Sequence, residues 1–197
     1  FYIDGYKVEV WSLLVYNPAI GEYEPIDGVP TYLLKCDRFF SNIRNPNGEF
    51  DIYRSWLDDA MQKGSNLVHP ENAATGIFFS KATLKASEKM NLKPDIIVSA
   101  DWQLALIPPL LKEAEDPSKY RYFEKTKTIQ MIHNIAYKGM FDPHTKIKIG
   151  PTEKTLWKFS GLKDSAYLQP DNNGLEFHSA ASPLKGGLCK SDANGTV

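Results

Sequence analysis

Cysteine is scarce in this chain, and long apolar runs and an excess of either charge are absent. Of its 197 residues only two are cysteines, Cys36 and Cys189. Neither belongs to a Cys-x-x-Cys pair or has a histidine at the spacing of a metal site, so no metal ion and no disulfide framework are expected. Both are interpreted as small, ordinary residues of a protein from a reducing compartment such as the cytoplasm.

Other absences exclude whole classes of function. No stretch approaches the roughly 20 apolar residues that a membrane-spanning helix needs, so a soluble protein without a membrane partner is expected. The 23 Lys and Arg are balanced by 24 Asp and Glu, and the net charge is -1. Nucleic-acid binding needs a concentrated basic face, so the balanced charge argues against a nucleic-acid partner.

Several short motifs are missing or carry little weight. Neither phosphate-binding pattern, G-x-G-x-x-G or G-x-x-x-x-G-K-[ST], occurs, and neither does the G-x-S-x-G elbow of serine hydrolases. Lys185 beside Gly186 and Gly187 is therefore interpreted as a surface lysine. The sequon at residues 194–196 is of a kind that arises by chance. The first residues have no initiating Met and no signal-peptide pattern, which is typical of a cut or processed end.

The pattern along the chain predicts the order of the elements. Two period-2 runs, residues 8–11 and 13–16, with turn residues between and after them, predict a hairpin, and residues 31–36 predict a strand. Residues 41–47 are typical of a loop. Apolar residues recur at helical spacing over residues 71–90, and Pro94 ends that helix.

Further along, residues 95–99 form a short continuous apolar run, typical of a strand buried on both faces. Residues 102–112 return to helical spacing with a kink at two prolines, and residues 128–132 predict the next strand. Residues 156–159 suggest a short helix. The succession of helix and strand predicts one α/β domain, residues 1–197, with a doubly wound, mostly parallel sheet.

Ligands of such sheets bind outside the carboxyl ends of the strands. Asp101, Trp102 and Gln103 follow the first buried strand, and His133 follows the second. A carboxylate, an indole face and an imidazole can all recognise a sugar. Each has an alternative: Asp101 as a helix cap, Trp102 as a core residue, and His133 as a structural histidine. Their joint position at adjacent strand ends favours a binding site.

Three segments then resemble bacterial glycogen synthases and plant starch synthases. Residues 29–40 are similar to their D-R-F-F segment, residues 93–106 to P-D-I-I-H-x-H-D-W-Q-x-A-L, and residues 132–141 to I-H-N-x-A-Y-Q-G-x-F. Residues 175–187 resemble L-E-F-x-G-x-x-S-F-L-K-A-G more faintly. The order and spacing agree over residues 8–197, and the second and third blocks together are quite specific to this family.

The resemblance implies the N-terminal Rossmann-like half of a GT-B-type glycosyltransferase. Such enzymes carry out a retaining transfer of glucose from ADP-glucose, the donor substrate, to the non-reducing end of an α-1,4-glucan, without a metal or other cofactor. By matching position, His133 and Asp101 are the catalytic candidates. Trp102 and Gln103 would lie beside the acceptor, and Asn134 and Tyr137 would shape the loop of His133. A plant or algal relative would be expected in the plastid.

The chain also departs from the family pattern. Ser99 and Ala100 replace the two histidines that precede the Asp-Trp pair of the second block, depending on how the block is aligned, and residues 71–76 lack the Arg and Phe of D-N-x-x-R-F. The donor-binding Lys-x-Gly-Gly-Leu loop and the C-terminal nucleotide-binding domain are missing. We therefore expect this chain alone to be inactive, with an exposed half-cleft that favours self-association.

Three hypotheses remain open at this point. The first is half of an active synthase, and the second is a catalytically silent relative that binds glucan or a partner. The third is a domain of another two-domain glycosyltransferase family. The choice between ADP-glucose and UDP-glucose is not decided, because the base is read largely by the missing half.

Overall fold

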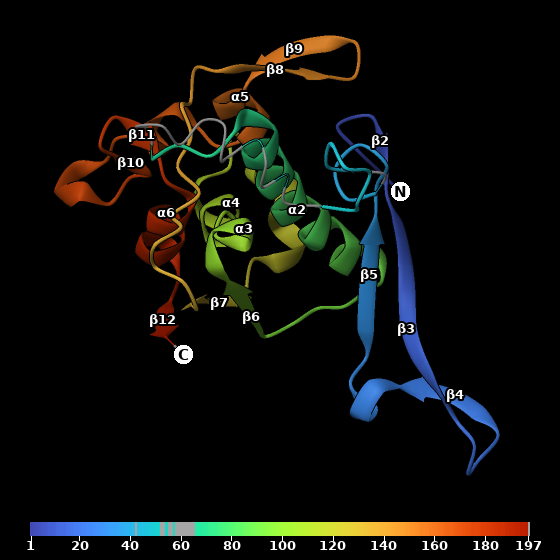
Figure 1. Cartoon of the computed structure of the whole chain (residues 1–197). Helices are drawn as coiled ribbons and strands as arrows, with labels where there is room; N and C mark the ends of the chain where they lie inside the picture. The colour runs from blue at the N-terminus through green and yellow to red at the C-terminus, as the bar shows by residue number, and fades with distance from the viewer. Residues whose placement is uncertain (42, 52–53, 55–56, 58–65, 197) are drawn as a thin grey trace.

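The computed structural model describes residues 1–41, 43–51, 54, 57 and 66–196 (Figure 1). Its strands are β1 (Tyr2–Ile3), β2 (Tyr6–Lys7), β3 (Glu9–Asn17), β4 (Glu22–Pro25), β5 (Thr31–Lys35), β6 (Ile96–Ala100), β7 (Lys127–Ile132), β8 (Lys146–Ile149), β9 (Thr152–Thr155), β10 (Glu176–Phe177), β11 (Ala180–Ala181) and β12 (Ala193–Thr196). Its α-helices are α2 (Pro70–Lys89), α3 (Asp101–Leu104), α4 (Ile107–Glu113), α5 (Leu156–Ser160) and α6 (Pro183–Lys190), and short 3-10 turns include η2 (Pro117–Phe123). The chain is thus mixed α/β, as predicted, but in the described ranges only one sheet is parallel, with three strands, and the others are antiparallel. A doubly wound, mostly parallel sheet stays a prediction.

Helix α2 is central to the packing. It begins with Pro70 behind the N-cap His69, whose Nδ1 accepts a hydrogen bond from the Glu71 amide at 3.2 Å. The helix stops at its C-cap Met90, next to Asn91, which has a positive φ of 56°. Both ends agree with the predicted helix over residues 71–90. None of the helices in the described ranges is long and apolar enough to cross a membrane.

The sheet that positions the site has three parallel strands in the order β12-β7-β6. Figure 1 shows α2, α3, α4 and α6 gathered on one side of it. Ser99, Thr128 and Gln130 point to that side and are completely buried, whereas Ile96 and Val98 are 54% and 58% exposed. The prediction that this strand is buried on both faces was therefore wrong, because the described helices cover only one face.

Other sheets in the described part of the chain are small and antiparallel. The N-terminal hairpin exists, but the two period-2 runs do not form its two arms. Apart from Val8, both lie on the single strand β3, and the chain turns at residues 18–21 into β4. Strand β5 pairs with the first half of β3, as the predicted strand over residues 31–36 required. The sequence interpretation failed here because a period-2 pattern does not show where a strand ends.

The remaining predictions mostly hold. The helix over residues 102–112 is divided into α3 and α4, and the two prolines occupy the first turn of α4, where a missing amide hydrogen costs nothing. The short helix at residues 156–159 is α5. The described part of residues 41–47 is a loop apart from one isolated bridge at Arg44, and Asn42 lies outside the described residues. Helix α6 and strand β12 were not predicted.

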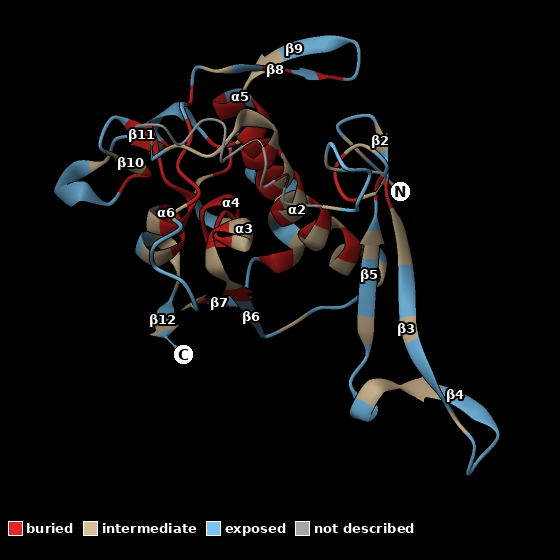
Figure 2. Ribbon diagram, in the orientation of Figure 1, coloured by how far each residue is buried: buried red, intermediate tan, exposed pale blue. Residues whose placement is uncertain are grey.

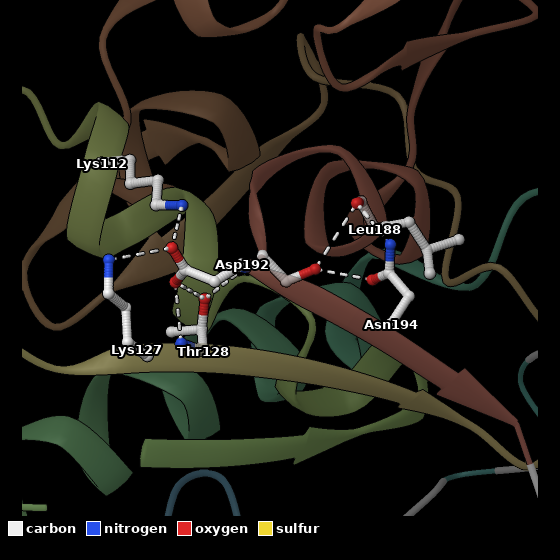
Figure 3. A network of polar contacts seen from close by, with 7 residues as sticks. Lys112, Lys127, Thr128, Leu188, Asp192 and Asn194 are labelled. Atoms are coloured by element: carbon white, nitrogen blue, oxygen red, sulfur yellow. Dashed lines mark hydrogen bonds and ion pairs between the residues drawn. The ribbon is translucent and has the colours of Figure 1, made fainter. Parts of the chain in front are cut away.

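Polar contacts attach β12 to the sheet (Figure 3). Oδ2 of Asp192 accepts hydrogen bonds from the backbone amide and hydroxyl of Thr128 at 2.9 and 3.1 Å. These bonds lower the pKa of Asp192, and the ammonium groups of Lys112 and Lys127 contribute further. Asn194, the first residue of the sequon, donates its side-chain amide to the Leu188 carbonyl at 3.0 Å. The sequon asparagine thus contributes to packing of the last strand.

A second polar cluster joins α4, α6 and the loop between them. The carboxylate of Glu113 lies 2.5 Å from Nζ of Lys163, 3.0 Å from Nζ of Lys190 and 3.1 Å from Nε2 of Gln169. Partial burial alone would raise the pKa of Glu113. The hydrogen bonds from Lys163, Lys190 and Gln169 outweigh it, and the pKa falls from 4.5 to about 2.

This cluster predicts a pH dependence of stability. A carboxyl group whose pKa is lower in the folded state stabilises the fold above its unfolded pKa, and this contribution is lost as the pH falls from about 4.5 to about 2. We expect Glu113→Gln to lower the free energy of unfolding at pH 7 by about 1.5–3 kcal/mol and to flatten that acid dependence. Urea unfolding at several pH values measures both. Glu153→Gln, at an exposed ion pair with Lys146, is the control and should cost under about 1 kcal/mol. Equal losses would contradict the prediction.

Candidate functional site

The parallel sheet brings the two predicted catalytic residues together. Asp101 follows β6 directly, and His133 follows β7 directly. Because β6 and β7 pair in parallel, their carboxyl ends share one edge of the sheet. Oδ1 of Asp101 accepts hydrogen bonds from the backbone amides of His133 at 2.8 Å and Asn134 at 3.1 Å. The carboxylate therefore fixes the start of the loop that carries the histidine.

The imidazole of His133 also faces this carboxylate. Its Nδ1 lies 3.5 Å from Oδ2 of Asp101, which is longer than a usual hydrogen bond but close enough for a strong electrostatic contact. The side chains are 50% and 26% exposed, respectively. A protonated imidazole would thus be paired with a carboxylate, and half of the ring remains accessible to a ligand.

Asp101 adopts an unusual backbone conformation. Its φ is 50°, in the left-handed region, which costs an L-residue roughly 1–2 kcal/mol. Strain of this kind is often found at functional sites. The N-cap of α3 is Ala100, and no side chain caps this helix. The alternative interpretation, that Asp101 is the N-cap of the following helix, is therefore wrong.

The buried side chain of Gln130 holds the backbone of Asp101 in place, a role that the sequence analysis did not predict. Its Nε2 donates to the carbonyls of Asp101 and Met131 at 3.1 and 3.0 Å, and its Oε1 accepts from the hydroxyl of Ser99 at 2.7 Å. All the hydrogen-bonding groups of this fully buried amide side chain are satisfied. In the sequence, the role of Gln130 was indicated only by the position of a polar side chain inside a mostly apolar predicted strand.

Trp102 points away from this edge into the interior. Its side chain is 9% exposed. A Cβ added to Gly76 would lie 2.9 Å from Cζ3 of the indole, and one added to Gly139 would lie 2.3 Å from Cε3. The ring thus fills space left by two glycines, which is the core role weighed against substrate binding. Gln103 is half-buried, and its carbonyl accepts a hydrogen bond from the hydroxyl of Ser80 at 3.2 Å.

Asn134 and Tyr137 belong to the exposed loop after β7. Oδ1 of Asn134 accepts a hydrogen bond from the amide of Ala136 at 3.0 Å, an Asx turn that shapes the loop. Tyr137 is 52% exposed and lines a cavity of about 510 Å³. Asn134 therefore lies at the Asp101–His133 contact, whereas Tyr137 lies on the adjoining cavity.

The other wall of this cavity comes from the C-terminal part of the chain. Phe177 and His178 line it, with ring centroids 4.3 Å apart in an edge-to-face arrangement. His178 also has a positive φ of 52°. Neither residue was selected as a candidate from the sequence, where only the faint resemblance of residues 175–187 pointed to the segment. In the described ranges, no three His, Cys, Asp or Glu side chains gather as a metal ion would need.

Comparisons with known proteins identify relatives of the chain. Residues 2–197 match the family model described as "Starch synthase catalytic domain". A glycogen synthase of Thermotoga maritima is 42% identical over an alignment of 163 residues that covers 76% of this chain and 30% of that protein. A glycogen synthase of Natranaerobius thermophilus is 38% identical over 174 residues, 86% of this chain and 27% of that protein. The chain thus spans about a third or less of the length of these relatives.

A solved structure has a similar fold. The catalytic domain of starch synthase IV from Arabidopsis thaliana, bound to ADP and acarbose, matches with a TM-score of 0.60 and 19% sequence identity. The match covers 98% of this chain and 31% of that one. At this identity the likeness establishes the fold alone.

Proposed function

This chain belongs to the starch synthase catalytic domain family of glycosyltransferases, and on that premise we propose that it is the N-terminal part of a glycogen or starch synthase. The parent would carry out a retaining transfer of glucose from ADP-glucose to the non-reducing end of an α-1,4-glucan. The observation that carries the proposal is the clamp of the Asp101 carboxylate on the backbone and ring of His133 at the sheet edge. Ligands of open α/β sheets bind at this edge.

In this proposal His133 contacts the glucose of the donor. Its Nδ1 faces Asp101, so its Nε2, for which the structure gives no partner among the described residues, is the atom available to a sugar hydroxyl. Asp101 holds the ring in place. Asn134 and Tyr137 shape the loop, and Gln103 and Trp102 stay predictions as acceptor contacts, with the burial of Trp102 favouring an indirect role through packing.

The rest of the parent supplies what this chain lacks. The diphosphate leaving group needs preorganised positive charge, which would come from the other domain together with most of the nucleotide contacts. We also propose that further elements complete a doubly wound, Rossmann-like sheet around β6, whose Ile96 and Val98 are exposed. The same exposed residues support the proposal that this chain associates with itself when alone. No cofactor enters the proposed reaction.

A catalytically silent relative is the second candidate, and one observation favours it. Ala100 stands immediately before Asp101, where the family motif has a histidine, and it is the N-cap of α3 with only a methyl side chain. At this position the chain therefore presents no imidazole to a ligand. A silent relative would keep glucan or partner binding without transfer.

Transfer of labelled glucose from ADP-glucose to glycogen separates the two candidates. The full-length parent and this 197-residue chain are assayed side by side, with UDP-glucose as a second donor. We expect transfer by the parent and none by the chain alone. An inactive parent that still binds glycogen would support the silent relative. Transfer from a different nucleotide sugar, tried as a further donor in the same assay, in preference to both would indicate another glycosyltransferase family.

A further inference from the structure

Strands β6 and β7 separate at the edge of the sheet where Asp101 and His133 meet. Their last paired residues are Ala100 and Met131, and the ladder of backbone hydrogen bonds ends there. Beyond this pair one segment turns into α3, and the other enters the exposed loop of His133. The relative position of the two segments therefore depends on side chains.

Two side-chain bridges cross this junction in opposite directions. From the end of β6, the carboxylate of Asp101 accepts hydrogen bonds from the backbone amides of His133 and Asn134. From β7, the side-chain amide of Gln130 donates to the carbonyl of Asp101 at 3.1 Å and to that of Met131 at 3.0 Å. A side chain from each strand end thus holds the main chain of the other.

The amide of Gln130 fits this junction in only one orientation. If it were turned end for end, its Oε1 would lie against two carbonyl oxygens, and both donor bonds would be replaced by repulsion. The hydroxyl of Ser99 donates to Oε1 at 2.7 Å. Space around this oxygen is also restricted, because a Cβ added to Gly187 of α6 would lie 2.8 Å from it. Hydrogen bonds and packing therefore fix the same side-chain position.

Stability alone gives little reason for an amide at this position. Gln130 is completely buried on the side of the sheet that the helices cover, and Figure 2 shows buried residues along those helices. An apolar side chain of similar size would avoid the loss of hydration that a buried amide suffers, and the net gain from each hydrogen bond is small. The benefit of glutamine lies in the geometry that it imposes on the junction.

We propose that Gln130 is a positioning residue for His133 and acts through Asp101. The carbonyl and the side chain of Asp101 are attached to the same Cα, so a fixed carbonyl limits the directions in which the carboxylate can point. That carboxylate holds both the backbone and the ring of His133. The contribution of Gln130 to turnover rests on the proposed function, whereas its contribution to the geometry of the loop does not.

Hydrogen exchange at the backbone amides of His133 and Asn134 tests this role in the full-length parent without any substrate. We expect Gln130→Met, which keeps the length of the side chain but has no donor, to speed exchange at both amides at least tenfold, measured by NMR. Thr128→Val is the matched control, because Thr128 is also buried on this face of β7 but is bonded to Asp192, nearer the start of the strand. It should change both rates by less than twofold. Amides within α2 should exchange at the same rate in both variants, which excludes a general loss of stability.

Turnover of the parent separates positioning from a merely structural role. We expect Gln130→Met to lower the turnover of glucosyl transfer at least fivefold, and Thr128→Val to leave it within twofold. In a parent that already carries His133→Ala, Gln130→Met should have less than a twofold effect, because the group that it positions is no longer present. Such non-additivity is the signature of two residues that act as a unit.

Three results would overturn the proposal. They are unchanged exchange at both amides, equal acceleration by Thr128→Val, and an equal loss of turnover with and without the imidazole of His133. If Gln130→Met does not fold, Ser99→Ala removes one bond to the same amide and should speed exchange about threefold, and an unchanged rate would count equally against the proposal. Faster exchange in a parent without transfer activity would refute the proposed transfer and leave the positioning role in place, so the two failures are distinguishable.

Discussion

Replacing His133 with alanine in the full-length parent should lower the turnover of glucosyl transfer at least tenfold while the protein stays folded. The imidazole is half exposed at the sheet edge, and Asp101 holds both its backbone and its ring. Its removal deletes the hydrogen-bonding group proposed to contact the donor sugar, and loss of one positioned donor at a reacting centre typically costs a factor of about 10²–10³. Steady-state kinetics with ADP-glucose and glycogen measure the loss.

The control for this variant is another exposed histidine. His144 follows Asp142 in a turn beyond the site loop, and its amide donates to Oδ1 of Asp142 at 2.9 Å. His144→Ala removes the same side chain and should leave turnover within about twofold of the parent. Near-normal turnover in His133→Ala, with circular dichroism unchanged, would contradict the role proposed for His133.

The sequence predicted those parts of the fold whose signal is local. Helix α2 follows from apolar spacing and a proline boundary, and the apolar runs of β6 and β7 gave the parallel strands. The meeting of Asp101 and His133 was also predictable, because residues that follow two adjacent parallel strands share one edge. These conclusions need no knowledge of how the elements pack.

Burial and side-chain contacts depend on how the elements pack, and the local sequence did not predict them. An apolar strand was interpreted as buried on both faces, yet nothing in its own residues tells whether helices cover one face or two. Gln130 lies in a mostly apolar strand, and its hydrogen bond to the Asp101 carbonyl joins two segments that are 29 residues apart in the sequence. The burial of Trp102 depends on two glycines far apart in the sequence.

Replacing Gly139 with alanine should destabilise the chain by about 2–4 kcal/mol. Gly139 is buried at the end of the loop that carries His133, and its φ is 64°. A Cβ there would lie within 2.3–2.9 Å of three atoms of Trp102, far inside van der Waals contact. The indole cannot withdraw easily, since Gly76 lies close to Cζ3 of the same ring. The free energy of unfolding, measured in urea, gives the cost.

Gly150 offers a matched control that separates packing from backbone strain. Its φ of 58° is nearly the same, but an added Cβ would meet nothing within 4 Å. Gly150→Ala should therefore cost only the left-handed strain of about 1–2 kcal/mol. The difference between the two variants measures the close packing of the Trp102 ring against the loop of His133. Equal costs would mean that the indole moves aside freely, and Trp102 would then be a mobile side chain able to reach a bound sugar rather than a fixed support beneath the loop.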